Sequence, residues 1–514
     1  WIPEQDVGGK DNKRSDELRI RASNLELAGL EGIRPLAAKL SPALGDVWRS
    51  TQPSGKINTL ALDIPLQAAD KTRFQASWSD LAWKQWKLLP GAEHFSGTLS
   101  GSVENGLLTA SMKQAKMPYE TVFRAPLEIA DGQATISWLN NNKGFQLDGR
   151  NIDVKAKAVH ARGGFRYLQP ANDEPWLGIL AGISTDDGSQ AWRYFPENLM
   201  GKDLVDYLSG AIQGGEADNA TLVYGGNPQL FPYKHNEGQF EVLVPLRNAK
   251  FAFQPDWPAL TNLDIELDFI NDGLWMKTDG VNLGGVRASN LTAVIPDYSK
   301  EKLLIDADIK GPGKAVGPYF DETPLKDSLG ATLQELQLDG DVNARLHLDI
   351  PLNGELVTAK GEVTLRNNSL FIKPLASTLK NLSGKFSFIN GDLQSEPLTA
   401  SWFNQPLNVD FSTKEGAKAY QVAVNLNGNW QPAKTGVLPA AVNEALSGSV
   451  AWDGKVGIVL PYHAGATYNV ELNGDLKNVS SHLPSPLAKP AGEPLPVNVK
   501  VDGNLNSFDL TGQA

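Results

Sequence analysis

The chain has 514 residues, of which 41% are hydrophobic and 21% charged, with 49 Gly and 32 Pro. This composition is typical of a folded, turn-rich protein and excludes a disordered one. The formal net charge of -12 argues against a nucleic-acid ligand, because nucleic-acid binders concentrate Lys and Arg on one face. The sequence contains no cysteine, which excludes disulfides, thiolate metal sites and cysteine nucleophiles.

Helical patterns are few along the chain. The spacing of apolar residues predicts short helices at 33–48 and 79–89 and a longer helical insertion at 174–214. Shorter helical caps are expected near 314–336 and 437–446. Helices therefore alternate with strands too rarely for a parallel sheet built from βαβ units.

Alternation of apolar and polar residues dominates the sequence and predicts strands with one apolar and one wet face. In LTNLDIELDFINDGL, residues 260–274, the side chains of Ile265, Leu267 and Phe269 point to one face. The same alternation occurs at 240–246, 302–309, 345–350, 420–428, 468–474 and 497–503. Turn signals such as ENG, NDG and NGD separate the runs, so we expect a mainly β protein in which an antiparallel sheet meanders through tight hairpins.

A repeat connects two parts of the chain. LKNLSGKFSFINGDL at 379–393 repeats the phrase at 260–274 with an offset of 119 residues, and Leu246-Arg247-Asn248 recurs as Leu365-Arg366-Asn367 at the same offset. The repeat predicts homologous units at 246–352 and 365–462. Repeats of this length are typical of stacked units whose neighbours complete each other's hydrophobic face.

Candidate catalytic motifs are incomplete. Ser377-x-x-Lys380 with Lys434-Thr435-Gly436 imitates two boxes of the penicillin-binding enzymes, but the third box is missing between them. The six histidines are never paired at the spacing of metal ligands, at positions 94, 160, 235, 347, 463 and 482. We expect no enzyme activity, no metal and no cofactor, although a carboxylate pair formed across strands stays open.

The central block carries a family resemblance. FPENLMGKDLVDYLSGAIQGGEADNATLVYGG at 195–226, then Phe231-Pro232-Tyr233 and QPDWPALTNLDIELDFINDGL at 254–274, resemble the AsmA-like (AsmA/TamB/YhdP) family of bacterial envelope proteins. The resemblance implies that residues 1–514 form one continuous segment of a long, twisted, taco-shaped antiparallel β-sheet groove, with a few short helices capping or flanking it. It also implies an interior segment whose inner-membrane anchor lies outside these residues.

The resemblance further implies a function. Proteins of this kind are bridge-like lipid transporters whose apolar concave face carries phospholipid acyl chains across the periplasm between the inner and outer membranes. The implied partners are phospholipids and the two membranes, the latter through regions outside this segment, and we expect a monomer without nucleic acid. The residues that would line the groove are the inward-pointing ones: Leu60, Leu62, Ile64, Phe240, Val242, Val244, Leu246, Ile265, Leu267, Phe269, Leu303, Ile305, Ile309, Leu346, Leu348, Ile350, Phe386, Phe388, Val422, Val424, Leu426, Val470, Leu472, Val497, Val499 and Val501.

Alternation by itself permits another interpretation. An apolar sheet face is normally covered by a second sheet, which would make the chain a structural or adhesive β-repeat rod of the cell envelope with closed sandwich units and no lipid. Strand patterns are identical in the two cases, so the sequence leaves open whether lipid or protein covers the apolar face.

Overall fold

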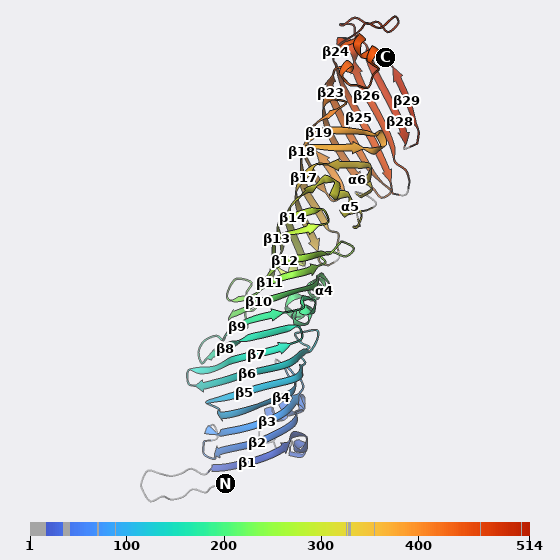
Figure 1. Cartoon of the computed structure of the whole chain (residues 1–514). Coiled ribbons are helices and arrows are strands. Elements are labelled where there is room, and N and C mark those ends of the chain that lie inside the picture. Colours follow the sequence, from blue (N-terminus) through green and yellow to red (C-terminus); the bar gives the residue numbers. More distant parts are fainter. Residues whose placement is uncertain are drawn as a thin grey trace, which may run out of the picture. The chain divides into compact units, whose positions relative to one another are not determined.

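Strands make up most of the computed structural model, which describes residues 17–33, 42–68, 71–87, 89–324, 326, 330–353, 355–462, 464–504 and 506–513. The strands form a 27-stranded sheet and a separate two-stranded sheet, and only short helices accompany them (Figure 1). The prediction of a mainly β, antiparallel fold with few helices is confirmed.

The chain divides into two compact units. The first comprises Trp1–Phe251, Thr261–Met276 and Val294–Lys302, and the second comprises Ala252–Leu260, Lys277–Ala293 and Leu303–Ala514. The residues of β13 (Gly273–Leu283), β14 (Val286–Ile295) and β15 (Lys302–Pro312) are divided between the two units.

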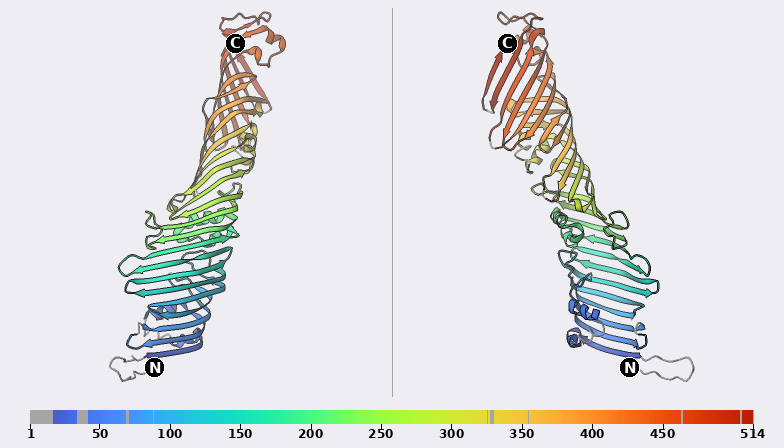
Figure 2. Two further views of the ribbon diagram at one scale, coloured as in Figure 1. Left: turned by 60° about the vertical axis from the view of Figure 1, so that its left-hand side comes forward. Right: turned by 180° about the vertical axis from the view of Figure 1, so that it is seen from behind.

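The first unit is a meander in which each strand pairs antiparallel with the next, from β1 with β2 to β10 with β11 (Figure 2). Its strands are β1 (Glu17–Glu26), β2 (Ser54–Pro65), β3 (Arg73–Trp83), β4 (Ala92–Ser102), β5 (Asn105–Met117), β6 (Leu127–Asn141), β7 (Gly144–Ala156), β8 (Val159–Pro170), β9 (Trp176–Thr185), β10 (Ile212–Gly226), β11 (Gln239–Phe251) and most of β12 (Leu260–Ile270). Its helical segments are η1 (Leu27–Ile33), α2 (Pro42–Thr51), η3 (Gly188–Tyr194), α3 (Glu197–Met200), α4 (Lys202–Ala211) and η4 (Tyr298–Lys300).

The second unit is also an antiparallel meander, and β19 pairs with both β20 and β21. Its strands are β16 (Leu336–Asp339), β17 (Asp341–Pro351), β18 (Thr358–Ile372), β19 (Ser377–Ile389), β20 (Asp392–Ser395), β21 (Leu398–Trp402), β22 (Gln405–Glu415), β23 (Ala419–Trp430), β25 (Val450–Pro461), β26 (Thr467–Asp475), β28 (Pro496–Asn504) and β29 (Phe508–Gln513), with β24 (Leu446–Gly448) and β27 (Val479–Ser481) forming the small sheet. Its helical segments are η5 (Gly313–Ala315), α5 (Val316–Phe320), α6 (Ala331–Glu335), η7 (Lys373–Leu375), η8 (Pro432–Lys434), α7 (Ala440–Ala445) and η9 (Leu476–Asn478).

The two copies of the repeated phrase adopt the same local structure. Asn271 and Asn390 both have a left-handed backbone, with φ of 52° and 53°, which Asn tolerates better than most residues. The Oδ1 atom of Asn271 accepts a hydrogen bond from the N–H of Phe240 at 3.0 Å, and that of Asn390 accepts one from the N–H of Ala359 at 2.8 Å. Each asparagine thereby ties its hairpin turn to a neighbouring strand. The repeat units at 246–352 and 365–462 remain a prediction.

One helix prediction is wrong. Residues 79–83 belong to strand β3 instead of a helix over 79–89, and Leu88 lies outside the described residues. A β-bulge interrupts the alternation of this strand, because Asp80 has a φ of 61° and the pairing register shifts between Trp78 and Leu81. The bulge lets Trp78 and Trp83 both contact the ring of Phe95, with centroid distances of 5.8 and 5.1 Å.

Two other helix predictions need new boundaries. The predicted helix at 33–48 corresponds to α2, which runs from Pro42 to Thr51, while residues 34–41 lie outside the described part of the chain. The predicted insertion at 174–214 is helical only in η3, α3 and α4. Its first part is strand β9, because the alternation in WLGILAGIST favours a strand over a helix. Its last residues, from Ile212, belong to β10.

Candidate functional site

An apolar ladder crosses the first unit from β1 to β11. The pairing register places the following residues directly opposite one another, each on the next strand: Ala22, Leu60, Ala76, Leu99, Leu108, Ile136, Gly149, Phe165, Ile179, Tyr224 and Phe240. Because partners in an antiparallel pair point to the same face, these side chains form one row on one face of the sheet. No charged residue interrupts the row.

A second row runs beside the first on the same face. Its members, again each opposite the next, are Ile20, Leu62, Phe74, Gly101, Gly106, Trp138, Leu147, Tyr167, Leu177 and Gly226. The predicted lining residues Leu60, Leu62 and Phe240 lie in these two rows, and Val242 pairs with Leu222 in the next one. The structure therefore brings together residues that the sequence treats as separate runs.

The opposite face of the same strands is polar. Ser23, Thr59, Ser77, Thr98, Thr109, Thr135 and Arg150 form a ladder there, each opposite the next. The hydroxyls of Thr59 and Ser77 lie 2.6 Å apart, as do those of Thr98 and Thr109. Cross-strand hydroxyl pairs of this kind stabilise a water-exposed sheet surface.

An ion pair belongs to this polar face. The Nε atom of Arg166 donates to Asp148 Oδ1 at 2.6 Å, and Gln146 donates to the other carboxylate oxygen at 2.5 Å. Burial alone would raise the pKa of the Asp148 carboxyl, but the hydrogen bonds from Arg166 and Gln146 and the positive charge of Arg166 hold that pKa below its ordinary value. Asp148 is therefore ionised at neutral pH.

The side chains of the first ladder are only half-buried. Leu60, Leu99, Leu108, Ile136 and Phe165 all keep part of their surface accessible. A second sheet packed against this face would bury such side chains almost completely, as in a β-sandwich. The ladder positions across β2 to β8 are thus partly accessible, whereas the same face is buried around Met112 on β5 and Ile129 on β6.

The apolar side of β12 is different, because protein covers it. Ile265, Leu267 and Phe269 are 6%, 4% and 9% exposed. The ring of Phe195, at the end of η3, lies 6.4 Å from the ring of Phe269. The adjoining helix α4 contributes Leu204, whose side chain is fully buried. Phe195, in the segment from η3 to α4, therefore covers the apolar side of this strand at Phe269.

The second unit repeats the apolar ladder. Phe411, Val424, Val456, Val470, Val501 and Leu510 form one row across β22, β23, β25, β26, β28 and β29. Its neighbour contains Leu398, Val409, Leu426, Gly454, Leu472, Val499 and Gly512. On β17 to β19, Leu346 and Phe388 flank Gly361, and Ala344 and Phe386 flank Val363.

Burial in the second unit also changes along the rows. Residues on β17 to β23 belong to one buried cluster, which includes Leu365, Leu398 and Leu426. Val470 and Val501 are half-buried, and Leu510 on β29 is 63% exposed. The predicted lining residues of this unit thus divide into a buried set and an accessible set.

The predicted lining residues can be sorted by burial over the whole described chain. The buried ones are Leu246, Ile265, Leu267, Phe269, Leu303, Ile305, Ile350, Val422 and Leu426. The half-buried ones are Leu60, Leu62, Ile64, Phe240, Val242, Val244, Ile309, Leu346, Leu348, Phe386, Phe388, Val424, Val470, Leu472, Val497, Val499 and Val501. Whether lipid contacts any of them remains a prediction.

Some ladder positions are glycines, which the alternation of apolar residues does not identify. Gly106 lies beneath the ring of Trp138, and a Cβ atom at Gly106 would lie 2.0 Å from that ring. Gly149 has the same relation to Phe165, at 2.1 Å. Each aromatic ring therefore lies flat over a glycine of the neighbouring strand. The signal that could have found these pairs is an aromatic residue and a glycine at alternating positions of adjacent predicted strands.

The candidate catalytic motif belongs to the packing of the sheet. Ser377 Oγ accepts a hydrogen bond from Trp402 Nε1 at 2.6 Å, and Lys380 pairs with Ser401 across β19 and β21. Among the residues that the structure describes, no three His, Asp or Glu side chains gather in a way that could hold a metal ion. His463 lies outside those residues.

Within the described ranges, no helix is both long enough and apolar enough to cross a membrane.

The chain is similar in sequence to a known transporter. The chain is 99% identical over 514 residues to a protein of Escherichia coli (strain K12) named "Intermembrane phospholipid transporter YhdP", and the alignment covers 100% of the chain and 41% of that relative. The chain thus spans less than half the length of the curated relative that it matches. No solved structure matches it. The sequence profile of the family described as "YhdP protein" matches residues 1–514. The chain belongs to the YhdP family.

Proposed function

We propose that this chain carries phospholipid acyl chains along the apolar face of its sheet, as the periplasmic part of a lipid bridge between the inner and outer membranes. The observation that carries the proposal is the uninterrupted apolar ladder from Ala22 to Phe240, whose side chains are half-buried while the opposite face is polar. The name of the 99% identical relative supports the same cargo and the same pair of membranes.

The free energy of hydration explains why such a face is needed. Exposure of an acyl chain to water costs about 0.8 kcal/mol per CH₂, or on the order of 13 kcal/mol for roughly 16 carbons. A row of Leu, Ile, Val and Phe side chains replaces water along the whole chain. Head groups would remain beside the sheet in water, and the net charge of -12 would keep the protein soluble.

Because the row is uniform, we expect acyl chains to move along it and not to be held at one position. Neighbouring ladder positions offer similar aliphatic and aromatic surfaces, so no position binds an acyl chain much more tightly than the next. An inward charge would interrupt this surface, because desolvation of a charged group in an apolar environment costs several kcal/mol. The ladder of the first unit contains no such group.

A closed structural rod is the second candidate, and a specific observation favours it locally. The apolar side of β12 is covered by the segment from η3 to α4, and the cluster around Leu398 in the second unit is buried. These covered regions behave as ordinary protein cores. The rod interpretation predicts that no lipid accompanies the purified chain.

Organic extraction of the purified chain followed by mass spectrometry separates the two candidates. Lipid transport predicts several phospholipids per chain. A stable, lipid-free chain would support the structural rod and contradict our proposal.

A pair of neighbouring substitutions tests the ladder itself. Leu108 points to the apolar face and Thr109 to the polar face of β5, so Leu108→Asp and Thr109→Asp introduce the same charge on opposite sides. We expect Leu108→Asp to slow lipid transfer between vesicles by tenfold or more, since about 1.4 kcal/mol of added barrier corresponds to tenfold. Thr109→Asp should transfer lipid at the unmodified rate. Equal rates for both variants would refute the ladder as the path.

A further inference from the structure

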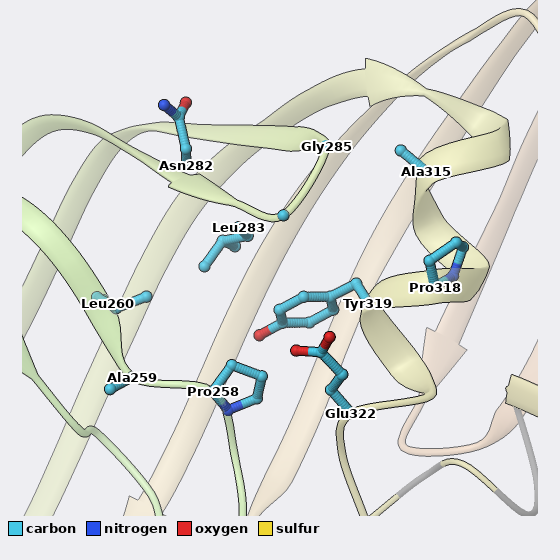
Figure 3. Close-up of a pocket in the computed structure, with 11 residues that line it drawn as sticks. Pro258, Ala259, Leu260, Asn282, Leu283, Gly285, Ala315, Pro318, Tyr319 and Glu322 are labelled. Atoms are coloured by element: carbon cyan, nitrogen blue, oxygen red, sulfur yellow. The ribbon is translucent and has the colours of Figure 1, made fainter.

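A cavity of about 260 Å³ lies within the second unit, outside the apolar ladders. Three segments border this half-open cavity: residues 258–260 at the start of β12, the hairpin of β13 and β14, and η5 and α5 with the residues that follow (Figure 3). The lining residues are Pro258, Ala259, Leu260, Asn282, Leu283, Gly284, Gly285, Ala315, Pro318, Tyr319 and Glu322.

Close packing fixes the walls of this cavity. The backbone of Gly285 approaches η5 so closely that a Cβ atom there would lie 2.5 Å from the Cβ of Ala315. On another side, aromatic rings contact one another in sequence, with centroid distances of 5.8 Å from Phe253 to Trp257 and 6.3 Å from Trp257 to Tyr319. The position of the Tyr319 ring is therefore set by packing on both the hairpin and the aromatic side.

Two polar groups point into the cavity. Figure 3 shows the hydroxyl of Tyr319 and the carboxylate of Glu322 directed toward the space beside Pro258 and Leu283. Burial, with a contribution from the negative charge of Glu322, raises the pKa of Tyr319 to about 12, so its hydroxyl is neutral at neutral pH. Among the residues that the structure describes, no Lys or Arg lines the cavity.

This set of groups selects for a cation. A carboxylate forms charge-assisted hydrogen bonds with an ammonium group, and the face of an aromatic ring attracts cations as well. A phosphate or carboxylate ligand would meet Glu322 without a compensating positive side chain in the lining. Pro258, Leu260 and Leu283 supply an apolar wall on the opposite side.

We propose that this cavity binds the ammonium group of a zwitterionic phospholipid, held by Glu322 and Tyr319, while the methylene carbons of the head group contact the apolar wall at Leu260 and Leu283 and the phosphate stays outside in water. The lipid part of the proposal rests on the proposed function. The second unit would then distinguish lipids with an ammonium head group from anionic lipids at one fixed position beside β12.

The methyl signals of labelled alanines report ligand binding at the cavity in the whole chain. Ala259 and Ala315 line it, whereas Ala76 and Ala110 lie on the apolar face of the first unit. Residues 1–514 with ¹³C-labelled alanine methyls are titrated with dihexanoylphosphatidylethanolamine, dihexanoylphosphatidylglycerol and free ethanolamine. We expect the cavity methyls to respond to the ethanolamine lipid at roughly tenfold lower concentration than to the glycerol lipid. Equal responses to the two lipids would overturn the preference for ammonium.

The remaining outcomes of the titration distinguish failure of the cavity proposal from failure of the proposed function. A response of the cavity methyls to ethanolamine at the concentrations that suffice for the lipid would assign the site to a soluble amine and overturn the lipid assignment. If Ala76 and Ala110 respond to lipid while Ala259 and Ala315 do not, the cavity proposal is wrong and the proposed function stands. If none of the four methyls responds to either lipid, both are wrong.

A charge-neutralising variant tests the carboxylate. Glu322→Gln keeps the size of the side chain and should weaken binding of the ethanolamine lipid at the cavity about tenfold. Glu444 on α7 is exposed, as Glu322 is, but does not line the cavity, so it provides the matched control, and Glu444→Gln should leave the affinity unchanged. Unaltered methyl spectra of the ligand-free variants establish that they fold. If folded Glu322→Gln binds the ethanolamine lipid with unchanged affinity, the Glu322 carboxylate does not bind the ammonium group.

Discussion

Leu108 on β5 and Leu267 on β12 occupy equivalent positions in the alternation of their strands, but their surroundings differ. Leu108 lies in the half-buried ladder, whereas Leu267 is 4% exposed on a strand whose apolar side contacts the segment from η3 to α4. Alternation determines the face to which a side chain points. What covers that face determines whether the side chain is core or surface.

The second unit contains a comparable contrast. Val422 on β23 is 4% exposed and lies beside Tyr420, whose hydroxyl donates to the carbonyl of Gly391 at 2.6 Å. Val470 on β26, although part of the same apolar face, is half-buried. A buried tyrosine with a satisfied hydroxyl is typical of a permanent core, so the β22–β23 region belongs to the protein core, whereas Val470 on β26 keeps part of its surface accessible.

The largest expected effect comes from a charge in the covered region. Leu267→Asp places a carboxylate where no water reaches it, which should destabilise the first unit by about 3 to 5 kcal/mol. Hydrogen exchange of the β12 amides measures this loss, because local opening exposes them. Leu108→Asp is the control and should leave the exchange of β12 unchanged. Similar exchange in the two variants would mean that the covered and accessible regions do not differ.

A smaller effect is expected from the glycine that lies beneath an aromatic ring. Gly149→Ala adds a methyl group where an ideal Cβ atom would lie 2.1 Å from the Phe165 ring, so the ring must turn out of its flat position. We expect a loss of about 1 to 3 kcal/mol, as for other overpacked sites, together with slower lipid transfer because the displaced ring interrupts the row. Gly182→Ala is the matched control, since nothing lies within 4 Å of a Cβ atom there. Thermal unfolding and lipid transfer between vesicles are measured for both variants. Equal stability and equal transfer rates would show that the contact between Gly149 and Phe165 does not matter.

Much of this structure follows from sequence patterns, and the exceptions have physical causes. Alternation identifies the strands and the faces of Leu60, Val242 and Val470 correctly, because the period of two is a property of the extended backbone. It says nothing of burial, which depends on residues far away in the chain, such as Phe195 for Phe269.

Two failures have more local origins. The bulge at Asp80 changes the apparent period of its strand and produces a false helix over 79–89. The inward glycines conceal Gly106 and Gly149 as members of an apolar row, since glycine has no hydrophobic side chain to reveal the pattern. Pairing register, which aligns each glycine with the aromatic ring on the next strand, is available only from the structure.

The smallest expected effect lies on the polar face and depends on pH. The folded-state pKa of Asp148 lies below its unfolded value of about 3.9, so the ionised carboxylate stabilises the fold above that value and the contribution is lost as the pH falls through the folded-state pKa. Asp148→Asn should therefore lower stability by about 1 kcal/mol at pH 7. The difference from the unmodified chain should narrow as the pH falls below about 4.

Urea unfolding at a series of pH values measures this difference, and Asp502→Asn on β28 is the control for a change of net charge. Because Asp148 and Arg166 lie on the face opposite the apolar rows, lipid transfer by Asp148→Asn should match that of the unmodified chain. A pH-independent loss of stability would show that shape, and not charge, matters at this position. A loss of transfer without a loss of stability would contradict the assignment of lipid to the apolar face, because the charge lies on the other side of the same strands.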